Sequence, residues 1–292
     1  MNGPARRRPA LRIGTRGSPL ALRQAALVAG AIESPVQIVV LRTGGDRGEG
    51  SDKSRWVDAI EAALLDRRID LAVHSAKDVP GELAGGLQIV GAPARADPRD
   101  AICGAASLDA LAPGARVGTS SLRRTAQLRA LREDLDVVPL HGNLDTRLGR
   151  LAGGDFDAIV LAAAGLERLG RDGWSTLDEL VPSAGQGTLA LEARAGDERV
   201  RAAVAGLRDG AAERALAAER ALVAALGAGC DTPLGAYAAP AGGGGELELE
   251  AFIGAPDGAR WIRDRARGED PVALGETVAE RLLLAGAGAL LR

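Results

Sequence analysis

The sequence predicts an α/β protein with two similar lobes and a smaller α+β domain at its C-terminal end. Two stretches share one signature, in which a short apolar strand ends in glycine and a helix then opens with hydroxyl residues and arginine: LRIGTRGSPL and ARVGTSSLRR. Strands alternate with helical patterns over the first two hundred residues, which is typical of a sheet covered on both faces. From about residue 210 the pattern changes to a helix, three strands and a final helix.

The elements of the two lobes are short apolar runs between amphipathic segments. The strands expected in chain order are 11–14, 36–41, 70–74, 87–92, 115–118, 137–140 and 157–161. The helices expected between and after them are 19–32, 56–67, 122–133, 143–152 and 164–169. The charged, proline-containing stretch 93–98 is expected to cross from one lobe to the other. Ligands of open α/β sheets bind at the carboxyl ends of strands, so we expect a cleft there.

The two strand-to-helix junctions are candidate anion sites. Ser18 is a good N-cap, and Pro19 stands at the first helical position, where a missing N–H costs nothing. In the second junction Thr119, Ser120 and Ser121 precede the helix. Each junction offers free backbone N–H groups and the positive end of a helix, which suit a carboxylate or a phosphate.

The C-terminal part predicts a third, smaller domain. A helix over 211–226 is followed by a glycine-rich loop and by strands at 235–240, 246–255 and 260–268. The turn between the last two strands is Pro-Asp-Gly, which favours a reversal of the chain. A chain of 292 residues with 46% hydrophobic residues is long enough for two or three such units.

Composition excludes several classes of protein. The net charge of -3 and the 2% aromatic content argue against a nucleic-acid partner, which would need a basic field or stacking platforms. No apolar run approaches the roughly 20 residues of a membrane span. The basic N-terminal stretch lacks the apolar run of a secretory signal. These features predict a cytoplasmic protein with reduced thiols and no membrane partner.

Arginines gather at the predicted ligand edge. Because a guanidinium pairs bidentately with carboxylates and phosphates, several in one cleft indicate a polyanionic ligand. The alternative for any one of them is a solvated charge on a helix face. Their shared placement just after strand ends favours binding for the set Arg16, Arg123, Arg124, Arg147 and Arg168.

The stretch DLAVHSAKDVP, residues 70–80, is the candidate catalytic motif. A carboxylate at the mouth of a strand, beside Lys77, can transfer a proton or stabilise a developing cation, and Asp78 stands there. The alternative is that Asp78 pairs with Lys77 or caps a turn. His74 is interpreted as a hydrogen-bonding core histidine. With two histidines and no metal-binding spacing, no metal site is expected.

The two cysteines differ in their surroundings. Cys103 stands in an apolar run and is expected to be a buried, unreactive thiol. Cys230 stands in the loop GAGCDTPLGAY, where Gly227 and Gly229 leave room for the sulfur to be exposed.

Taken together, the segments of this chain resemble the porphobilinogen deaminase family, also called hydroxymethylbilane synthases. The resemblance runs from about residue 11 to the end, with matches in the family order. The matching stretches are IGTRGSPLAL, DLAVHSAKDVP, ADPRDA, VGTSSLRRTAQL, GNLDTRL, DAIVLAAAGLERLG, VPSAGQGTLALEAR and GAGCDTPLGAY.

The resemblance implies a monomer of three domains, two of them doubly wound lobes of the periplasmic-binding-protein kind. The first lobe is expected over 10–93 plus 188–205, because the family returns a segment to it after the GQG motif. The second is expected over 99–181, and the α+β domain with the cysteine loop over 210–292.

The resemblance also implies an activity. Family members condense four porphobilinogen molecules head to tail, release ammonia each time and hydrolyse the product free as hydroxymethylbilane, a step of tetrapyrrole and haem biosynthesis. Their cofactor is a dipyrromethane, which Cys230 would hold through a thioether. Asp78 matches the catalytic aspartate, which would assist proton transfer and stabilise the cation left when ammonia departs.

Further residues match family positions around cofactor and substrate, whose acetate and propionate groups suit arginine. They are Arg16, Ser18, Ser75, Lys77, Thr119, Ser120, Ser121, Arg123, Arg124, His141, Gly142, Asn143, Arg147, Arg168 and Gln186. In the loop expected to cover the site, the corresponding residues are Asp46, Lys53 and Trp56.

Two departures from the family pattern keep alternatives open. His141 stands where the family commonly has arginine, which replaces a permanent cation by a group of reference pKa ~6.5. The loop 43–56 is shorter than in many members, and Asp58 and Ala59 replace the usual lysine and glutamate. The alternatives are a degenerate member that binds pyrroles without turnover and a two-lobed carboxylate-binding protein.

Overall fold

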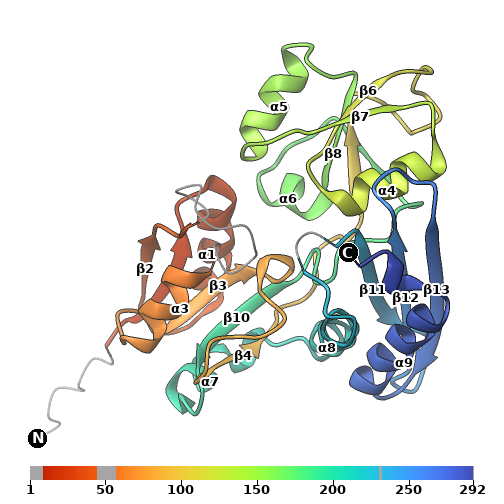
Figure 1. The fold of residues 1–292 in the computed structure, drawn as a ribbon. Coiled ribbons are helices and arrows are strands. Elements are labelled where there is room, and N and C mark those ends of the chain that lie inside the picture. Colours follow the sequence, from red (N-terminus) through yellow and green to blue (C-terminus); the bar gives the residue numbers. More distant parts are fainter. Residues whose placement is uncertain (1–8, 45–56, 230–231, 292) are drawn as a thin grey trace, which may run out of the picture.

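The structure, a computed structural model, describes residues 9–44, 57–229 and 232–291. Within them the chain forms two five-stranded sheets and one three-stranded sheet, which occupy three separate regions of the molecule (Figure 1). The α/β fold class predicted from the sequence is confirmed, with a small antiparallel domain at the C-terminal end.

The first lobe is built on the sheet β2-β1-β3-β10-β4. Its strands are β1 (Leu11–Arg16), β2 (Val36–Leu41), β3 (Leu71–Ser75), β4 (Leu87–Gly91) and β10 (Leu189–Arg194). The helices of this lobe are α1 (Pro19–Ala31), α3 (Asp58–Leu65) and α7 (Glu198–Val204). Strands β1, β2 and β3 are parallel, whereas β10 runs antiparallel to β3 and β4.

The second lobe repeats this plan in the sheet β7-β6-β8-β5-β9. Its strands are β5 (Asp100–Cys103), β6 (Arg116–Gly118), β7 (Asp136–Val138), β8 (Ala158–Ala162) and β9 (Trp174–Leu177). Its helices are α4 (Leu122–Leu131), α5 (Leu144–Ala152) and α6 (Ala163–Arg168). Here β5 is the antiparallel strand, paired with β8 and β9.

The two antiparallel strands mark the places where the chain changes lobe. β5 follows the crossing 92–99 out of the first lobe, and β10 follows the return crossing 182–188. The crossings lie side by side, since the amide of Ala96 donates to the carbonyl of Gly187 over 3.2 Å. The stretch 93–98 was predicted as a crossing, and that prediction is confirmed.

Each lobe has apolar layers on both faces of its sheet. Ile13, Leu71 and Leu191 point to one face of the first sheet, while Ile60 and Leu64 of α3 cover the other. The second lobe is built in the same way, with Ile102 in one cluster and Ile159 in the other. Because both faces are packed, the ligand edge of each sheet lies at the carboxyl ends of its parallel strands.

The third unit is an antiparallel sheet with two helices on one face. Its strands are β11 (Leu234–Pro240), β12 (Leu247–Gly254) and β13 (Trp261–Gly268), and its helices are α8 (Gly210–Ala225) and α9 (Pro271–Leu284). The core-facing residues of β12 alternate with glutamates, and those glutamates pair with arginines of β13. This period of two is what a sheet with one solvent-exposed face requires.

Helix α8 joins this unit to the first lobe (Figure 1). Arg220 of α8 donates to the carbonyl of Gly81 over 2.7 Å, and the amide of Asp209 donates to the carbonyl of Ala92 over 2.8 Å. No helix within the described residues is both long and apolar enough to cross a membrane.

Candidate active site

A pocket opens at the carboxyl ends of β1 and β3 in the first lobe. Its volume is about 90 Å³, enough for a few water molecules or one small polar group. Five residues predicted from the sequence line it together: Arg16, Ser18, Ser75, Lys77 and Asp78.

Local backbone features bring these side chains to the pocket. Ser18 caps α1, accepting a hydrogen bond from the amide of Ala21 over 3.3 Å, and Pro19 follows at the first helical position, as predicted. β3 ends at Ser75, and a single 3₁₀ turn, η2 (Ala76–Asp78), then presents Lys77 and Asp78. The strand end and the turn therefore place a cation and a carboxylate at the mouth of one sheet.

The hydroxyl-rich junction of the second lobe caps α4. Ser121 accepts from the amide of Arg124 over 3.4 Å, and Thr119 accepts from the amide of Ser121 over 3.2 Å. Ser120 donates its only hydroxyl proton to the carbonyl of Leu140 over 2.6 Å. Its oxygen lies 3.3 Å from Nδ1 of His141.

The segment after His141 forms the start of α5. Asn143 caps this helix and accepts from the amide and hydroxyl of Thr146 over 2.9 and 3.0 Å. Gly142 has a φ of +112°, and its carbonyl accepts from Nε of Arg147 over 2.8 Å. Burial, with a smaller contribution from nearby Arg124, lowers the pKa of Arg147. A half-buried guanidinium without a carboxylate partner among the described contacts favours binding of an anion here.

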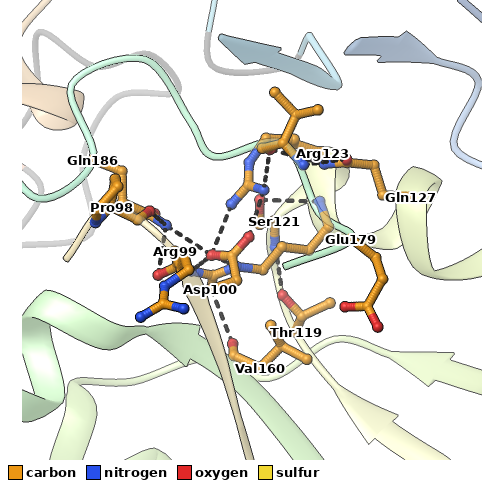
Figure 2. Close-up of polar contacts among 12 residues, drawn as sticks. Pro98, Arg99, Asp100, Thr119, Ser121, Arg123, Gln127, Val160, Glu179 and Gln186 are labelled. Carbon is orange, nitrogen blue, oxygen red and sulfur yellow. Dashed lines mark hydrogen bonds and ion pairs between the residues drawn. The ribbon is translucent and has the colours of Figure 1, made fainter. Parts of the chain in front are cut away.

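Arg123 and Arg124 converge on a buried carboxylate that sequence reasoning missed. Asp100 opens β5 and is fully buried, with an exposed fraction of 0%. Arg123 donates to it through Nη1 over 2.6 Å, and Arg124 through Nη2 over 2.7 Å. Figure 2 shows this carboxylate between the guanidinium of Arg123 and the amide of Gln186. Both arginines are buried, and their guanidinium groups are held by partners within the protein.

The cluster carries an excess of positive charge. Burial would raise the pKa of Asp100, but the two guanidinium groups outweigh it and hold the pKa far below its usual range. One carboxylate therefore faces two cations. Nε of Arg123 is buried and has no hydrogen-bond partner in the described part of the chain. This donor is closed off from solvent, so the cluster would attract an anionic ligand group through its net positive charge.

Gln186 connects this cluster to the pocket of the first lobe. It is 1% exposed, and its Nε2 donates to Asp100 over 2.8 Å while its Oε1 accepts from Nζ of Lys77 over 3.2 Å. Burial and the nearby Arg124 lower the pKa of Lys77 to about 8, against the opposing effect of Asp78 and Asp100. The two lobes therefore share one electrostatic network.

Arg168 lies at the seam between the lobes. Its Nη2 donates to the carbonyl of Gly187 over 2.6 Å, and Nε of Arg23 in α1 donates to the carbonyl of Arg168 over 3.1 Å. Burial lowers the pKa of Arg168. Four predicted site residues lie outside the described residues: Asp46, Lys53, Trp56 and Cys230.

Two further buried pairs of polar side chains were not predicted. Glu219 of α8 is fully buried and accepts from Arg95 over 2.6 Å, from the amide of Gly185 over 2.6 Å and from the amide of Ala238 over 2.8 Å. It therefore joins both crossings to the third unit.

The second pair involves the histidine of the catalytic motif. His74 is buried, and its Nε2 lies 2.9 Å from the carboxylate of Glu192 on β10, which agrees with the prediction of a hydrogen-bonding core histidine. Among the described residues, no three histidine, cysteine, aspartate or glutamate side chains are grouped so that they could hold a metal ion.

The fold and the site define a class of protein: a two-lobed α/β protein with a small polar pocket at the strand ends of its first lobe. The family model described as "Porphobilinogen deaminase, dipyromethane cofactor binding domain" matches residues 11–202, and "Porphobilinogen deaminase, C-terminal domain" matches residues 213–284. The chain belongs to the porphobilinogen deaminase family, as the sequence motifs predicted.

Two relatives of known name agree with this assignment. The chain is 50% identical to a porphobilinogen deaminase of Roseiflexus sp. over 96% of its own length and 97% of the relative. It is 42% identical to that of Brevibacillus brevis over 96% of each chain. A periplasmic substrate-binding protein of an ABC transporter from Coxiella burnetii is similar with a TM-score of 0.41 and 18% identity, over 70% of this chain and 94% of that chain.

Proposed function

We propose that this protein condenses four porphobilinogen molecules head to tail, with release of ammonia, into hydroxymethylbilane on a covalently bound dipyrromethane primer. As a member of the porphobilinogen deaminase family it is a transferase, a hydroxymethylbilane synthase of tetrapyrrole biosynthesis. The observation that carries the detailed chemistry is the pocket at the ends of β1 and β3, which Lys77, Asp78 and Arg16 line together.

The described residues fit a cofactor that carries carboxylates. A dipyrromethane made from two substrate units has four carboxylate side chains, and the buried cluster around Asp100 has more cationic than anionic groups. Arg123 is only 4% exposed, so its charge would act on such a carboxylate through the low-dielectric interior and not through direct contact with Nε. Two half-buried cations nearby, Arg147 and Lys77, add to the attraction.

In this proposal the residues of the second lobe hold the cofactor. Ser121, Thr119 and the N-terminus of α4 supply hydrogen-bond donors, and Arg123 and Arg124 supply charge. Cys230, by family resemblance, would form the thioether. When bound, the group supplies the primer on which the chain of pyrroles grows. Ser120 and His141, which contact each other, would line another side of this cofactor site.

Asp78 is proposed as the catalytic residue. A carboxylate in the pocket can accept a proton and return it, and it can stabilise the positive charge that develops on the substrate as ammonia leaves. Arg16 and Ser75 line the same pocket and would orient the substrate's carboxylates and amine. Lys77, which points to Gln186, would keep the local charge balanced around Asp78.

The domain limits also remain proposals. We propose three units over 10–93 plus 188–205, 99–181 and 210–292, acting as a cytoplasmic monomer on a small-molecule substrate. The loop with Asp46, Lys53 and Trp56 would cover the pocket mouth. Gly142, Asn143 and Arg168 would support the walls of the site through the backbone contacts described above.

Turnover of porphobilinogen tests the proposal. The purified protein should consume porphobilinogen and give a product that turns into coloured uroporphyrin after oxidation. Asp78→Asn should lower the rate by roughly 100- to 10,000-fold, the range for loss of an acid–base group, while the thermal midpoint stays the same. Asp97→Asn is the matched control, because Asp97 pairs with half-exposed Arg99 away from the pocket.

Two other outcomes correspond to the alternative functions. Binding of porphobilinogen without consumption, in the parent protein, would indicate a degenerate member of the family. The observation that favours this alternative is His141 at the edge of the site, where the side chain is exposed and bonded to Ser120. Binding of simple carboxylates with no covalent pyrrole would indicate a carboxylate-binding protein.

A further inference from the structure

The backbone of the GQG motif, residues 185–187, packs closely against neighbouring segments on both sides of Gln186. Gly185 has a φ of +73°, and a side chain there would come within 2.9 Å of the backbone of Ala76 and Lys77. Gly187 has a φ of +86°, and a side chain there would collide with the carbonyl oxygen of Ala96. Only glycine fits both positions, so the backbone on each side of Gln186 is pressed against neighbouring segments.

Side chains from three directions hold this backbone. Arg95 of the outward crossing donates to the carbonyl of Gln186 over 2.9 Å. Glu219 of α8 accepts from the amide of Gly185 over 2.6 Å, and Arg168 of the second lobe donates to the carbonyl of Gly187 over 2.6 Å. Movement of Gln186 would therefore break charge-assisted hydrogen bonds to the outward crossing, to α8 and to the second lobe.

The surroundings fix the orientation of the Gln186 amide. Its nitrogen faces two groups that can only accept, the carboxylate of Asp100 and the carbonyl of Pro98, each at 2.8 Å. Both N–H donors are thus used inside the protein. The oxygen must then point the other way, toward Nζ of Lys77 at 3.2 Å. A side chain that is 1% exposed with both donors satisfied has no N–H left for a ligand.

Lys77 needs such a partner because its environment opposes its charge. It is half-buried, and the charged groups that act on it are Arg123 and Arg124 from α4, Asp78 from its own turn and Asp100 from β5. The two arginines and the loss of water favour the neutral amine, whereas the two carboxylates favour the ammonium. The acceptor oxygen of Gln186 stabilises the ammonium more than the neutral amine, because the hydrogen bond from a charged donor is the stronger one.

We propose that Gln186 is a positioning residue, which holds the ammonium of Lys77 in its charged form beside Asp78 and ties it through Asp100 to the buried arginine pair. The contribution of Gln186 to catalysis rests on the proposed function, in which Asp78 is the catalytic residue. The charge state of Lys77 is a property of the protein itself and can be measured without turnover. A neutral Lys77 would leave the carboxylate of Asp78 without its neighbouring cation.

The sequence makes this measurement simple, because Lys53 and Lys77 are its only lysines. The full-length protein, carrying isotope-labelled lysine, gives two side-chain NMR signals whose chemical shifts follow protonation. The Lys77 signal should titrate near pH 8, as its lowered pKa indicates. In Gln186→Met, which keeps the length of the side chain and removes its acceptor, the midpoint should fall by about one pH unit, a tenfold change in the ionisation constant. Lys53 serves as the internal reference.

Gln127→Met is the matched control. Gln127 is also buried, and its amide is bonded on both sides to the backbone of Val181, over 3.0 and 2.7 Å, with no contact to Lys77. It should lose stability as Gln186→Met does and leave the Lys77 midpoint in place. An unchanged Lys77 midpoint in folded Gln186→Met would overturn the proposal and leave Gln186 a purely structural residue.

A second variant and a kinetic readout complete the test. If Gln186→Met does not fold, Gln186→Asn keeps the amide but is one methylene too short to reach both Asp100 and Lys77, and it should shift the midpoint in the same direction. If the parent protein turns over substrate, the alkaline limb of the pH profile of kcat/KM should move to lower pH in the variant, together with the NMR midpoint of Lys77. A shifted NMR midpoint in a protein without turnover would support the role of Gln186 while contradicting the proposed function.

Discussion

Replacing Asp100 by asparagine should destabilise the second lobe strongly. The substitution keeps the shape of the side chain and removes its charge. Asp100 is 0% exposed and accepts five hydrogen bonds, from Arg123, Arg124 and Gln186. An amide cannot balance the two guanidinium groups, and its own NH₂ would face donors instead of acceptors.

The magnitude follows from the burial of the cluster. Removing one partner of a buried ion pair costs about 3 to 5 kcal/mol, because the remaining charge stays in a medium of low polarity. In a chain of 292 residues, with an unfolding entropy of about 2.1 cal/mol/K per residue, that corresponds to a fall of the melting temperature of roughly 5 to 8 °C. Gln186 would also lose one of its acceptors, so the crossing segments should loosen with the lobe.

Differential scanning calorimetry of the parent and Asp100→Asn measures this loss. The control is Asp97→Asn, three residues earlier, where the partner Arg99 is 44% exposed and the pair should contribute less than about 1 kcal/mol. If Asp100→Asn melts at the same temperature as Asp97→Asn, the cluster does not stabilise the lobe and the reasoning is refuted.

Three further predictions follow from single contacts. Gly187→Ala should lower the melting temperature by several degrees because a Cβ would collide with Ala96, while Gly206→Ala, with open space around it, should not; equal melting temperatures would contradict this. Arg12 and Arg199 lower the pKa of Asp70 to about 2, below its unfolded value of about 3.9. Its stabilisation is therefore complete above pH ~4 and lost as pH falls toward 2, so urea unfolding of Asp70→Asn should differ from the parent at neutral pH and converge with it in acid. Burial raises the pKa of Cys103 to about 11, so thiol reagents should label it only after denaturation, and rapid labelling in the native protein, checked with Cys103→Ser, would refute its burial.

The sequence was most informative where the signal is local. The cap at Ser18 depends on neighbouring residues, and the structure places it as predicted. The predicted strands 11–14 and 70–74 are also present, although the first continues to Arg16 and the second ends at Ser75. The family motifs also led directly to the correct family. Strands such as β5, β9 and β10 were not singled out, because their pairing depends on partners far along the chain.

The buried charges could not be predicted for the same reason. Asp100 lies in a proline-containing, charged stretch that suggests a surface loop, and only the approach of Arg123 and Arg124 makes it a buried anchor. Glu192 gave no signal as the partner of His74, since the two are 118 residues apart. Some arginines that the sequence pattern assigned to ligand binding also stabilise the fold by pairing with buried groups. Pattern and spacing cannot distinguish these two roles.

The most direct test of the proposed function is the intact mass of the protein expressed in a host that makes porphobilinogen. The account predicts a mass above that of the polypeptide by one covalently bound dipyrromethane, and the polypeptide mass alone for Cys230→Ser. The bare polypeptide mass in the parent protein, or an equal excess in Cys230→Ser, would contradict it.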